Sequence, residues 1–294
     1  MGAPPPAPAP QLPLERGGAD PNGVGTGSSI LRESSKDAVK RVELGMSGHS
    51  KWAQIKRQKA ANDAKRGQAY TKAGREITVA VQLGGPDPAG NFRLEQALAR
   101  ARGINMPKDT IERAIQRALG GGDSGPLEEL TYEGYGPGGV GLLIEVVADN
   151  RNRTAAEIRS ALQRLGGTLA ASGSVAWQFE SRGELVVDVG SKAADAIELL
   201  AIDLGASDVD QTGDTVTVYT PPAELDRIRR GLVAAGCDVS SAELTMVPRS
   251  TTPAAAGDAE RVLRMIERLE ELDDVRRVHT TVEISDELLA KLAS

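Results

Sequence analysis

The sequence is poor in the residues on which most enzyme and metal sites depend. It contains one cysteine and two histidines in 294 residues. Cys237 cannot form an intrachain disulfide, and we expect it to be a small core residue. With only His49 and His279 available, histidine-based metal sites and Ser-His or Cys-His catalysis have few participants. We therefore expect a protein that is not an enzyme and that uses no metal and no cofactor.

Long apolar runs are also absent. No run approaches the roughly 18 residues that a transmembrane helix needs, and the N-terminus lacks the basic-then-apolar order of a secretory signal. A lone cysteine gives no sign of an oxidising compartment. The sequence therefore predicts a cytoplasmic protein with no membrane partner, and we expect a monomer.

Charge is distributed unevenly along the chain. The overall net charge of −6, taken alone, argues against a nucleic-acid partner. Residues 1–45 are neutral, residues 46–119 carry fourteen basic and six acidic side chains for a net charge of +8, and residues 120–294 carry −14. A basic segment of this kind attracts polyanions, while the acidic remainder limits indiscriminate binding. The distribution favours a nucleic-acid-binding protein.

The N-terminal half divides into two predicted segments. Residues 1–45 are rich in Ala, Pro, Gly and Ser without an apolar period, which predicts a disordered extension. Residues 46–125 form the predicted basic helical domain, because apolar residues recur there at helical spacing. The helices are expected at Ser50–Arg66 with an end at Gly67, at Tyr70–Val81, after a capping Asn91, and from Pro107 to Ala118.

The pattern changes to alternating strands and helices after Pro126. Val140–Val147 and Val175–Phe179 read as strands around a helix that Thr154 caps. A β-α-β-β-α-β run then fills residues 183–248, and a last helix and strand follow. We therefore expect an α+β fold, in which an N-terminal helical bundle precedes two α/β-sandwich domains of the ferredoxin-like, split βαβ type. The domain at 183–248 would be inserted into one formed by residues 126–182 and 249–294.

A basic cluster opens the helical domain and is the main candidate for binding. A helix with Lys and Arg on its open face offers positive donors at the spacing that phosphates need. The aromatic ring of Trp52 could stack on a base or cover the bundle. The predicted nucleic-acid contacts are His49, Lys51, Trp52, Lys56, Arg57, Lys59, Lys65, Arg66, Lys72 and Arg75.

Two further motifs have competing interpretations. Gly134–Gly139 satisfies G-x-G-x-x-G, but it precedes a strand rather than a helix and contains Pro137, so a tight turn is preferred to a nucleotide site. Asp149–Thr154 lies between a strand and a helix. Its Arg151 and Arg153 could hold a phosphate at the helix N-terminus, or the segment could be a polar turn.

Several long motifs in order resemble the YebC/PmpR family, whose mitochondrial relative activates translation of a cytochrome oxidase subunit. The resemblance covers about residues 46–290 and excludes the extension. It rests on the segments Met46–Lys56, Lys59–Gly67, Tyr132–Gly139, Asp149–Thr154 and Gly173–Val175.

The resemblance implies three domains, one helical and two α/β around a cleft, and supplies no catalytic residues. It implies a DNA-binding transcriptional regulator, or alternatively a ribosome- and RNA-associated translation factor that relieves stalled elongation. DNA or ribosomal RNA is therefore the expected partner. One departure concerns Ala73-Gly74, where the family tends to have bulkier apolar residues; Gly within a helix costs about 1 kcal/mol relative to Ala.

Overall fold

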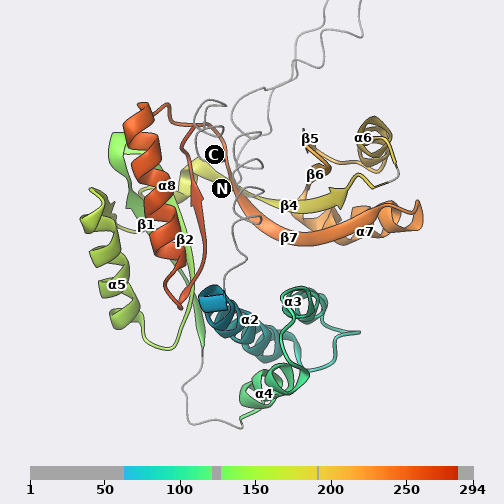
Figure 1. Cartoon of the computed structure of the whole chain (residues 1–294), viewed down its shortest axis with the longest axis horizontal. Helices are drawn as coiled ribbons and strands as arrows, with labels where there is room; N and C mark the ends of the chain where they lie inside the picture. The colour runs from blue at the N-terminus through green and yellow to red at the C-terminus, as the bar shows by residue number, and fades with distance from the viewer. Residues whose placement is uncertain (1–62, 121–126, 191, 284–294) are drawn as a thin grey trace, which may run out of the picture. The chain divides into compact units, whose positions relative to one another are not determined.

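The computed structural model describes residues 63–120, 127–190 and 192–283, all of which belong to one compact unit of the chain. Three helices precede two four-stranded antiparallel sheets, each covered by helices (Figure 1). The predicted α+β class is confirmed. The predicted extension at 1–45 lies outside the described residues.

The helical part, residues 63–120, contains α2 (Asp63–Gly84), α3 (Phe92–Gly103) and α4 (Lys108–Ala118). As predicted, Asn91 caps α3: its side-chain oxygen accepts from Leu94 N at 3.1 Å, and its amide donates to the Ala80 carbonyl at 2.8 Å. The same side chain thus ends one helix and begins the next. The buried residues of this small core are Ala73, Ile77, Ala80, Val81, Leu94, Ala97, Leu98, Ala101 and Met106.

The predicted helix end at Gly67 is wrong. Gly67 lies inside α2, which is a single helix of 22 residues. A lone glycine lowers helix stability by only about 1 kcal/mol. The contacts that α2 makes with α3 and α4 outweigh that preference, because they bury Ile77 and Ala80 completely.

The first sheet has the strand order β3-β1-β2-β8, and α5 and α8 cover one of its faces (Figure 1). Leu142, Ile144 and Val146 point from β2 into the core beneath these helices. Leu143 points to the opposite face, where it packs with Val175 and Phe179. Because β2 is buried on both faces, its sequence is a nearly continuous apolar run. The elements are β1 (Glu128–Tyr135), β2 (Gly141–Ala148), α5 (Arg151–Arg164), β3 (Thr168–Leu169), α8 (Ala256–Glu270) and β8 (Val275–Thr280).

The second sheet has the order β5-β6-β4-β7 and follows the predicted β-α-β-β-α-β sequence. Its first and third strands, β4 and β6, lie side by side at the centre, as in a ferredoxin-like sheet. Helices α6 and α7 pack on one face through Ile197, Ile228 and Leu232. The elements are β4 (Phe179–Asp188), α6 (Ala194–Asp203), β5 (Asp208–Thr212), β6 (Thr215–Thr220), α7 (Leu225–Ala234) and β7 (Asp238–Pro248).

One strand prediction needs correction, and one strand was not predicted. The predicted strand Val175–Phe179 is a 3-10 turn at Ala176–Gln178, and Phe179 begins β4, which runs unbroken through Gly183. Trp177 is therefore not in a sheet: its side chain is 69% exposed on this turn. The sequence did not predict strand β1, because three of its eight residues are exposed and only two are buried, so it lacks an apolar run.

The loop before β4 is held by a buried carboxylate on β1. Glu133 accepts hydrogen bonds from the backbone N–H groups of Gly173 (2.6 Å), Val175 (2.5 Å) and Ala176 (2.8 Å). Burial opposes ionisation of this side chain, but the three donors outweigh burial and hold its pKa below the ordinary value. Gly173 has φ +85°, a conformation that favours glycine and turns its N–H toward the carboxylate.

Replacing Glu133 with Ala should lower the free energy of unfolding by about 3 kcal/mol, because three backbone donors lose one shared acceptor. Urea unfolding followed by circular dichroism measures the loss. Glu112→Ala is the matched control, since Glu112 is exposed and pairs only with exposed Lys108. Equal stability of the two variants would contradict this role for Glu133.

Candidate nucleic-acid interface

Most of the predicted basic cluster precedes the described residues. His49, Lys51, Trp52, Lys56, Arg57 and Lys59 lie outside them, and the side chain of Lys65 is not described although its backbone is in α2. Arg66 is exposed on α2. The side-chain contacts of Lys72 and Arg75 show where these two members of the cluster lie.

Lys72 and Arg75 both have partners within the chain. The Lys72 ammonium donates to the Glu270 carbonyl, and burial lowers its pKa to about 8, although the nearby Asp273 and Glu76 favour the charged form. The Arg75 guanidinium donates to the Val147 carbonyl at 2.9 Å and pairs with the buried carboxylate of Asp274. These two cations connect α2 to the first sheet rather than project into open solvent.

The Asp149–Thr154 segment forms the start of α5, but its predicted cap is wrong. Asn150 is the capping residue: its side-chain oxygen accepts from the N–H groups of Asn152 and Arg153, both at 3.1 Å. Thr154 is one turn later and buried, with its hydroxyl 2.5 Å from the Asp274 carboxylate. Asn takes the cap because its oxygen reaches the first free amides from an extended backbone.

Both arginines of this segment have acidic neighbours. Arg151 is 2.8 Å from Glu128, and Arg153 lies 2.6 Å from Asp149 and 3.0 Å from Asp274. Burial disfavours ionisation of Asp274, but hydrogen bonds from Thr154, Arg75 and Arg153 hold its pKa below the ordinary value. The segment is therefore a capped helix start with compensated charges, and a phosphate there would compete with carboxylates.

A second ion-pair network surrounds Glu243 on β7. Its carboxylate pairs with Arg277 of β8 and, at 2.7 Å, with Arg100 of α3. Arg100 also lies 2.9 Å from Glu76 of α2. Burial alone would raise the pKa of Glu243, but the surrounding guanidinium groups lower it to about 2. Arg100 is therefore a further cation of the helical part that is paired within the chain.

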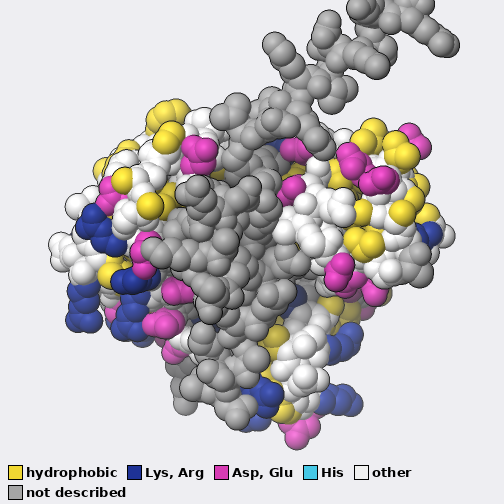
Figure 2. All heavy atoms as spheres, turned by 45° about the horizontal axis from the view of Figure 1, so that its top comes forward, with side chains coloured by type: hydrophobic (Ala, Val, Ile, Leu, Met, Phe, Trp, Pro, Cys, Tyr) yellow, Lys and Arg dark blue, Asp and Glu magenta, His cyan; other side chains and the backbone are white. Residues whose placement is uncertain are grey.

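Three arginines of the helical part are exposed and form no ion pair within the described residues. Arg102 of α3 and Arg113 and Arg117 of α4 have no carboxylate partner among the described residues. Figure 2 shows Lys and Arg side chains on the exposed surface of these helices. Sequence patterning did not single them out, because the basic run before them is denser. For Arg113 and Arg117, the sequence feature that could have identified them is their i, i+4 spacing, which places both side chains on one helix face.

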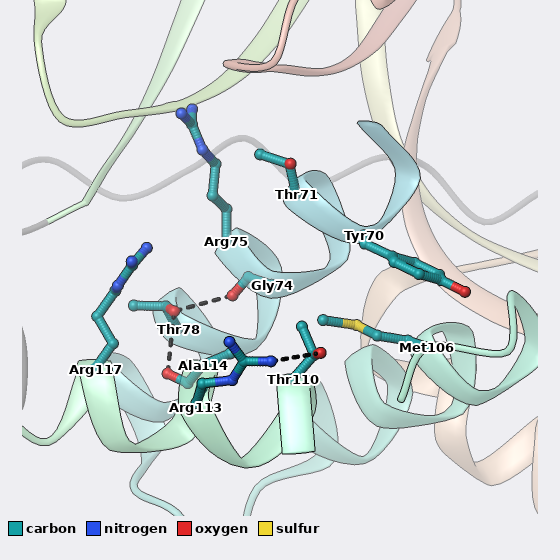
Figure 3. Close-up of a pocket in the computed structure, with 10 residues that line it drawn as sticks. All are labelled: Tyr70, Thr71, Gly74, Arg75, Thr78, Met106, Thr110, Arg113, Ala114 and Arg117. Carbon is teal, nitrogen blue, oxygen red and sulfur yellow. Dashed lines mark hydrogen bonds between the residues drawn. The ribbon is translucent and has the colours of Figure 1, made fainter. Parts of the chain in front are cut away.

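Arg113 and Arg117 border a groove of about 350 Å³ between α2 and α4. Figure 3 shows Gly74 and Thr78 of α2 opposite Ala114 of α4, with Tyr70 and Met106 at one end. The guanidinium group of Arg75 points away from α4. The groove thus combines a largely apolar lining with guanidinium groups at its rim.

The described residues contain no arrangement suited to a metal ion. No group of three or more His, Cys, Asp and Glu side chains within them could hold one.

His279 is buried against Phe179, and burial lowers its imidazole pKa, although Glu145 at 3.2 Å favours the charged form. Cys237 is buried, as expected. None of the described helices is both long and apolar enough to cross a membrane.

Family models match nearly all of the chain after residue 49. The model described as "TACO1/YebC protein N-terminal domain" matches residues 50–121. The model described as "TACO1/YebC second and third domain" matches residues 127–282. The two matches divide the chain between the helical part and the two sheets.

Individual relatives agree with this result. A "Probable transcriptional regulatory protein" of Roseiflexus castenholzii is 48% identical over 254 residues, which are 85% of this chain and all of that protein. One of Acidithiobacillus ferrooxidans, with the same name, is 49% identical over 247 residues, 84% of this chain and 98% of that one. The crystal structure of a conserved hypothetical protein from Aquifex aeolicus resembles this fold with a TM-score of 0.75. The two sequences are 40% identical, and the match covers 80% of this chain and 97% of that one.

The Glu243 network predicts acid sensitivity of the fold. A carboxylate whose pKa falls from 4.5 to about 2 on folding stabilises the protein above pH 4.5, and this stabilisation is lost as the pH falls toward 2. Glu243→Gln should lower the free energy of unfolding at neutral pH by about 3 kcal/mol and flatten its dependence on pH within that window. Thermal unfolding at several pH values tests this, with exposed Glu267→Gln as the control. An unchanged pH profile in Glu243→Gln would refute it.

Proposed function

Because the chain belongs to the TACO1/YebC family, we propose that it is a nucleic-acid-binding regulator of gene expression that acts on transcription by binding duplex DNA. The names of the relatives support regulation of transcription. No catalytic step is part of the proposal, in keeping with the regulatory names of the relatives.

The observation that carries the proposal is the set of exposed guanidinium groups on α3 and α4. Arg102, Arg113 and Arg117 have no carboxylate partner among the described residues, so binding a phosphate breaks no ion pair seen there. Guanidinium groups bind phosphate oxygens through paired hydrogen bonds. The net charge of +8 over residues 46–119 strengthens the attraction at longer range.

The two sets of cations in the helical part have different roles in this proposal. Lys72, Arg75 and Arg100 hold α2 and α3 against the sheets, so reaching DNA would require each to leave its partner. The proposed contacts are Arg102, Arg113 and Arg117, together with the basic residues 49–66. Arg151 and Arg153 are secondary candidates, because carboxylates already neutralise them.

We also propose that residues 183–248 form a domain inserted into one built from residues 126–182 and 249–294. The strand order supports this, because the chain leaves the first sheet after β3 and returns to it through α8 and β8. Strands β4 and β7, which are paired from Phe179 to Asp188, connect the two proposed domains. The first four residues of β4 precede the proposed boundary.

Reversing two exposed charges on α4 should weaken DNA binding. We expect Arg113→Glu/Arg117→Glu to lower the affinity for duplex DNA by roughly tenfold or more, and to make the slope of log K against log salt shallower by about 2. Fluorescence anisotropy with a labelled duplex at several salt concentrations measures both changes.

The matched control is Arg264→Glu/Arg268→Glu on α8. These residues share the i, i+4 spacing and the change in net charge, but in the native protein they pair with Glu260 and Glu271. Their reversal should change the affinity far less. Equal effects of the two double variants would show that only net charge matters and would exclude α4 as the interface.

A second candidate function is a ribosome- or RNA-associated translation factor that relieves stalled elongation. The groove between α2 and α4 favours it, since a recess beside guanidinium groups suits RNA with unpaired bases. Phosphate contacts alone do not separate the two functions, because both polymers carry the same backbone charge.

Two measurements separate these candidates. A transcriptional regulator should bind promoter fragments more tightly than random duplex at physiological salt, and should be missing from ribosomal fractions of a lysate. A translation factor should sediment with ribosomes and bind both duplexes equally. In a third outcome, the wild-type protein sediments with ribosomes while the Arg113→Glu/Arg117→Glu variant does not. That result would support the translation function with the same interface on α4.

A further inference from the structure

We propose that the groove between α2 and α4 holds one unpaired nucleotide of a single-stranded nucleic acid, with the base in the groove and a phosphate on Arg113 and Arg117. The inference rests on the proposed nucleic-acid binding, and it adds a site for a single strand beside the arginines that are proposed to contact duplex DNA.

The space for a base exists because α2 lacks a side chain at Gly74. A Cβ atom built there would meet only the Met106 methyl group, at 3.8 Å, which is ordinary van der Waals contact. The groove of about 350 Å³ is lined around this point by Ala114, Thr78 and Tyr70. Figure 3 shows Gly74 between the two helices, with the side chains of Tyr70 and Met106 closing one end.

The rim of the groove carries two guanidinium groups, those of Arg113 and Arg117, which no carboxylate among the described residues neutralises. Within the described part of the chain, the Arg113 guanidinium donates to the Asp109 carbonyl at 3.1 Å and the Thr110 hydroxyl at 3.2 Å. Arg117 lies one turn further along the same face of α4 and has no carboxylate partner in the described part of the chain. A guanidinium group has five N–H donors, so both retain donors for a phosphate at the edge of the groove.

The aromatic end of the groove is fixed in place before any ligand binds. The Tyr70 hydroxyl donates to the Asn105 carbonyl at 2.8 Å. Asn105 has φ +57° in the turn between α3 and α4, the one described residue other than glycine with a positive φ. Asn adopts this conformation more readily than most residues. A ring held in this way offers a stacking surface at little entropic cost.

The occupant of the groove is expected to be single-stranded, because a recess of this kind can take a base only when that base is unpaired. In a duplex each base is stacked and paired, so only phosphates and groove edges reach a protein surface. A base can enter a recess only after it leaves the stack, which is easy in single strands. The Arg113 and Arg117 side chains would still contact duplex phosphates, so duplex binding does not require the recess.

Filling the recess tests the inference. We expect Gly74→Leu to lower the affinity for oligouridine and oligothymidine by roughly tenfold, because the leucine occupies the space of the base, and to leave duplex affinity unchanged. Gly74→Ala is the matched control, since its Cβ fits and should leave all affinities unchanged. Comparing the ribose and deoxyribose strands shows whether the site distinguishes RNA from DNA.

A crosslinking measurement on the wild-type protein makes the test independent of how Gly74→Leu folds. Oligonucleotides with a single 4-thiouridine should crosslink to the peptides that contain Tyr70 or Met106. Crosslinks found only elsewhere would overturn the inference.

The outcomes distinguish failure of the inference from failure of the proposed function. If wild-type protein binds no nucleic acid, both fail. If it binds duplex while Gly74→Leu and Gly74→Ala bind single strands equally, the function stands and the nucleotide site is wrong. If Gly74→Leu lowers the melting temperature without ligand, the added side chain strains the fold, and the crosslinks to the wild-type protein decide whether the groove holds a base.

Discussion

The structure depends on the rule that a buried carboxylate must be paired, because an isolated buried charge is strongly unfavourable. Asp274 is 3% exposed and is bound by donors from α2 and α5. Glu243 is bound by Arg277 and Arg100. Glu133 is bound by the loop before β4. Each carboxylate fixes the position of an element that lies far away in the sequence.

This constraint explains why the motifs that identify the family do not also identify the ligand. Glu133 and Gly173, from two of those motifs, contact each other. Arg153 and Thr154, from another, both contact Asp274. These residues hold the loops and the start of α5 in place. The exposed Arg113 and Arg117 of α4 lie outside the quoted motifs, and they carry the proposed binding.

The positive charge of the helical part therefore divides into two populations. Lys72 and Arg75 are directed toward oxygens of α8, β2 and the buried Asp274, and Arg100 toward the largely buried carboxylate of Glu243. Arg102, Arg113 and Arg117 are exposed, where a carboxylate partner would add little stability. Net charge measures the sum of both populations, but only the second is available to a polyanion without breaking intramolecular contacts.

Sequence alone determined the apolar faces of α2 and α3, the capping role of Asn91, the β-α-β-β-α-β order of the second sheet and the segregation of charge. These features are local, because periodicity and capping depend on residues within a few turns. Tertiary structure decided the rest: the place of β1 in the first sheet, the continuity of β4, the groove at Gly74 and the partner of Arg75. Arg75 and Asp274 are 199 residues apart, and no local pattern specifies which distant carboxylate a given cation will meet.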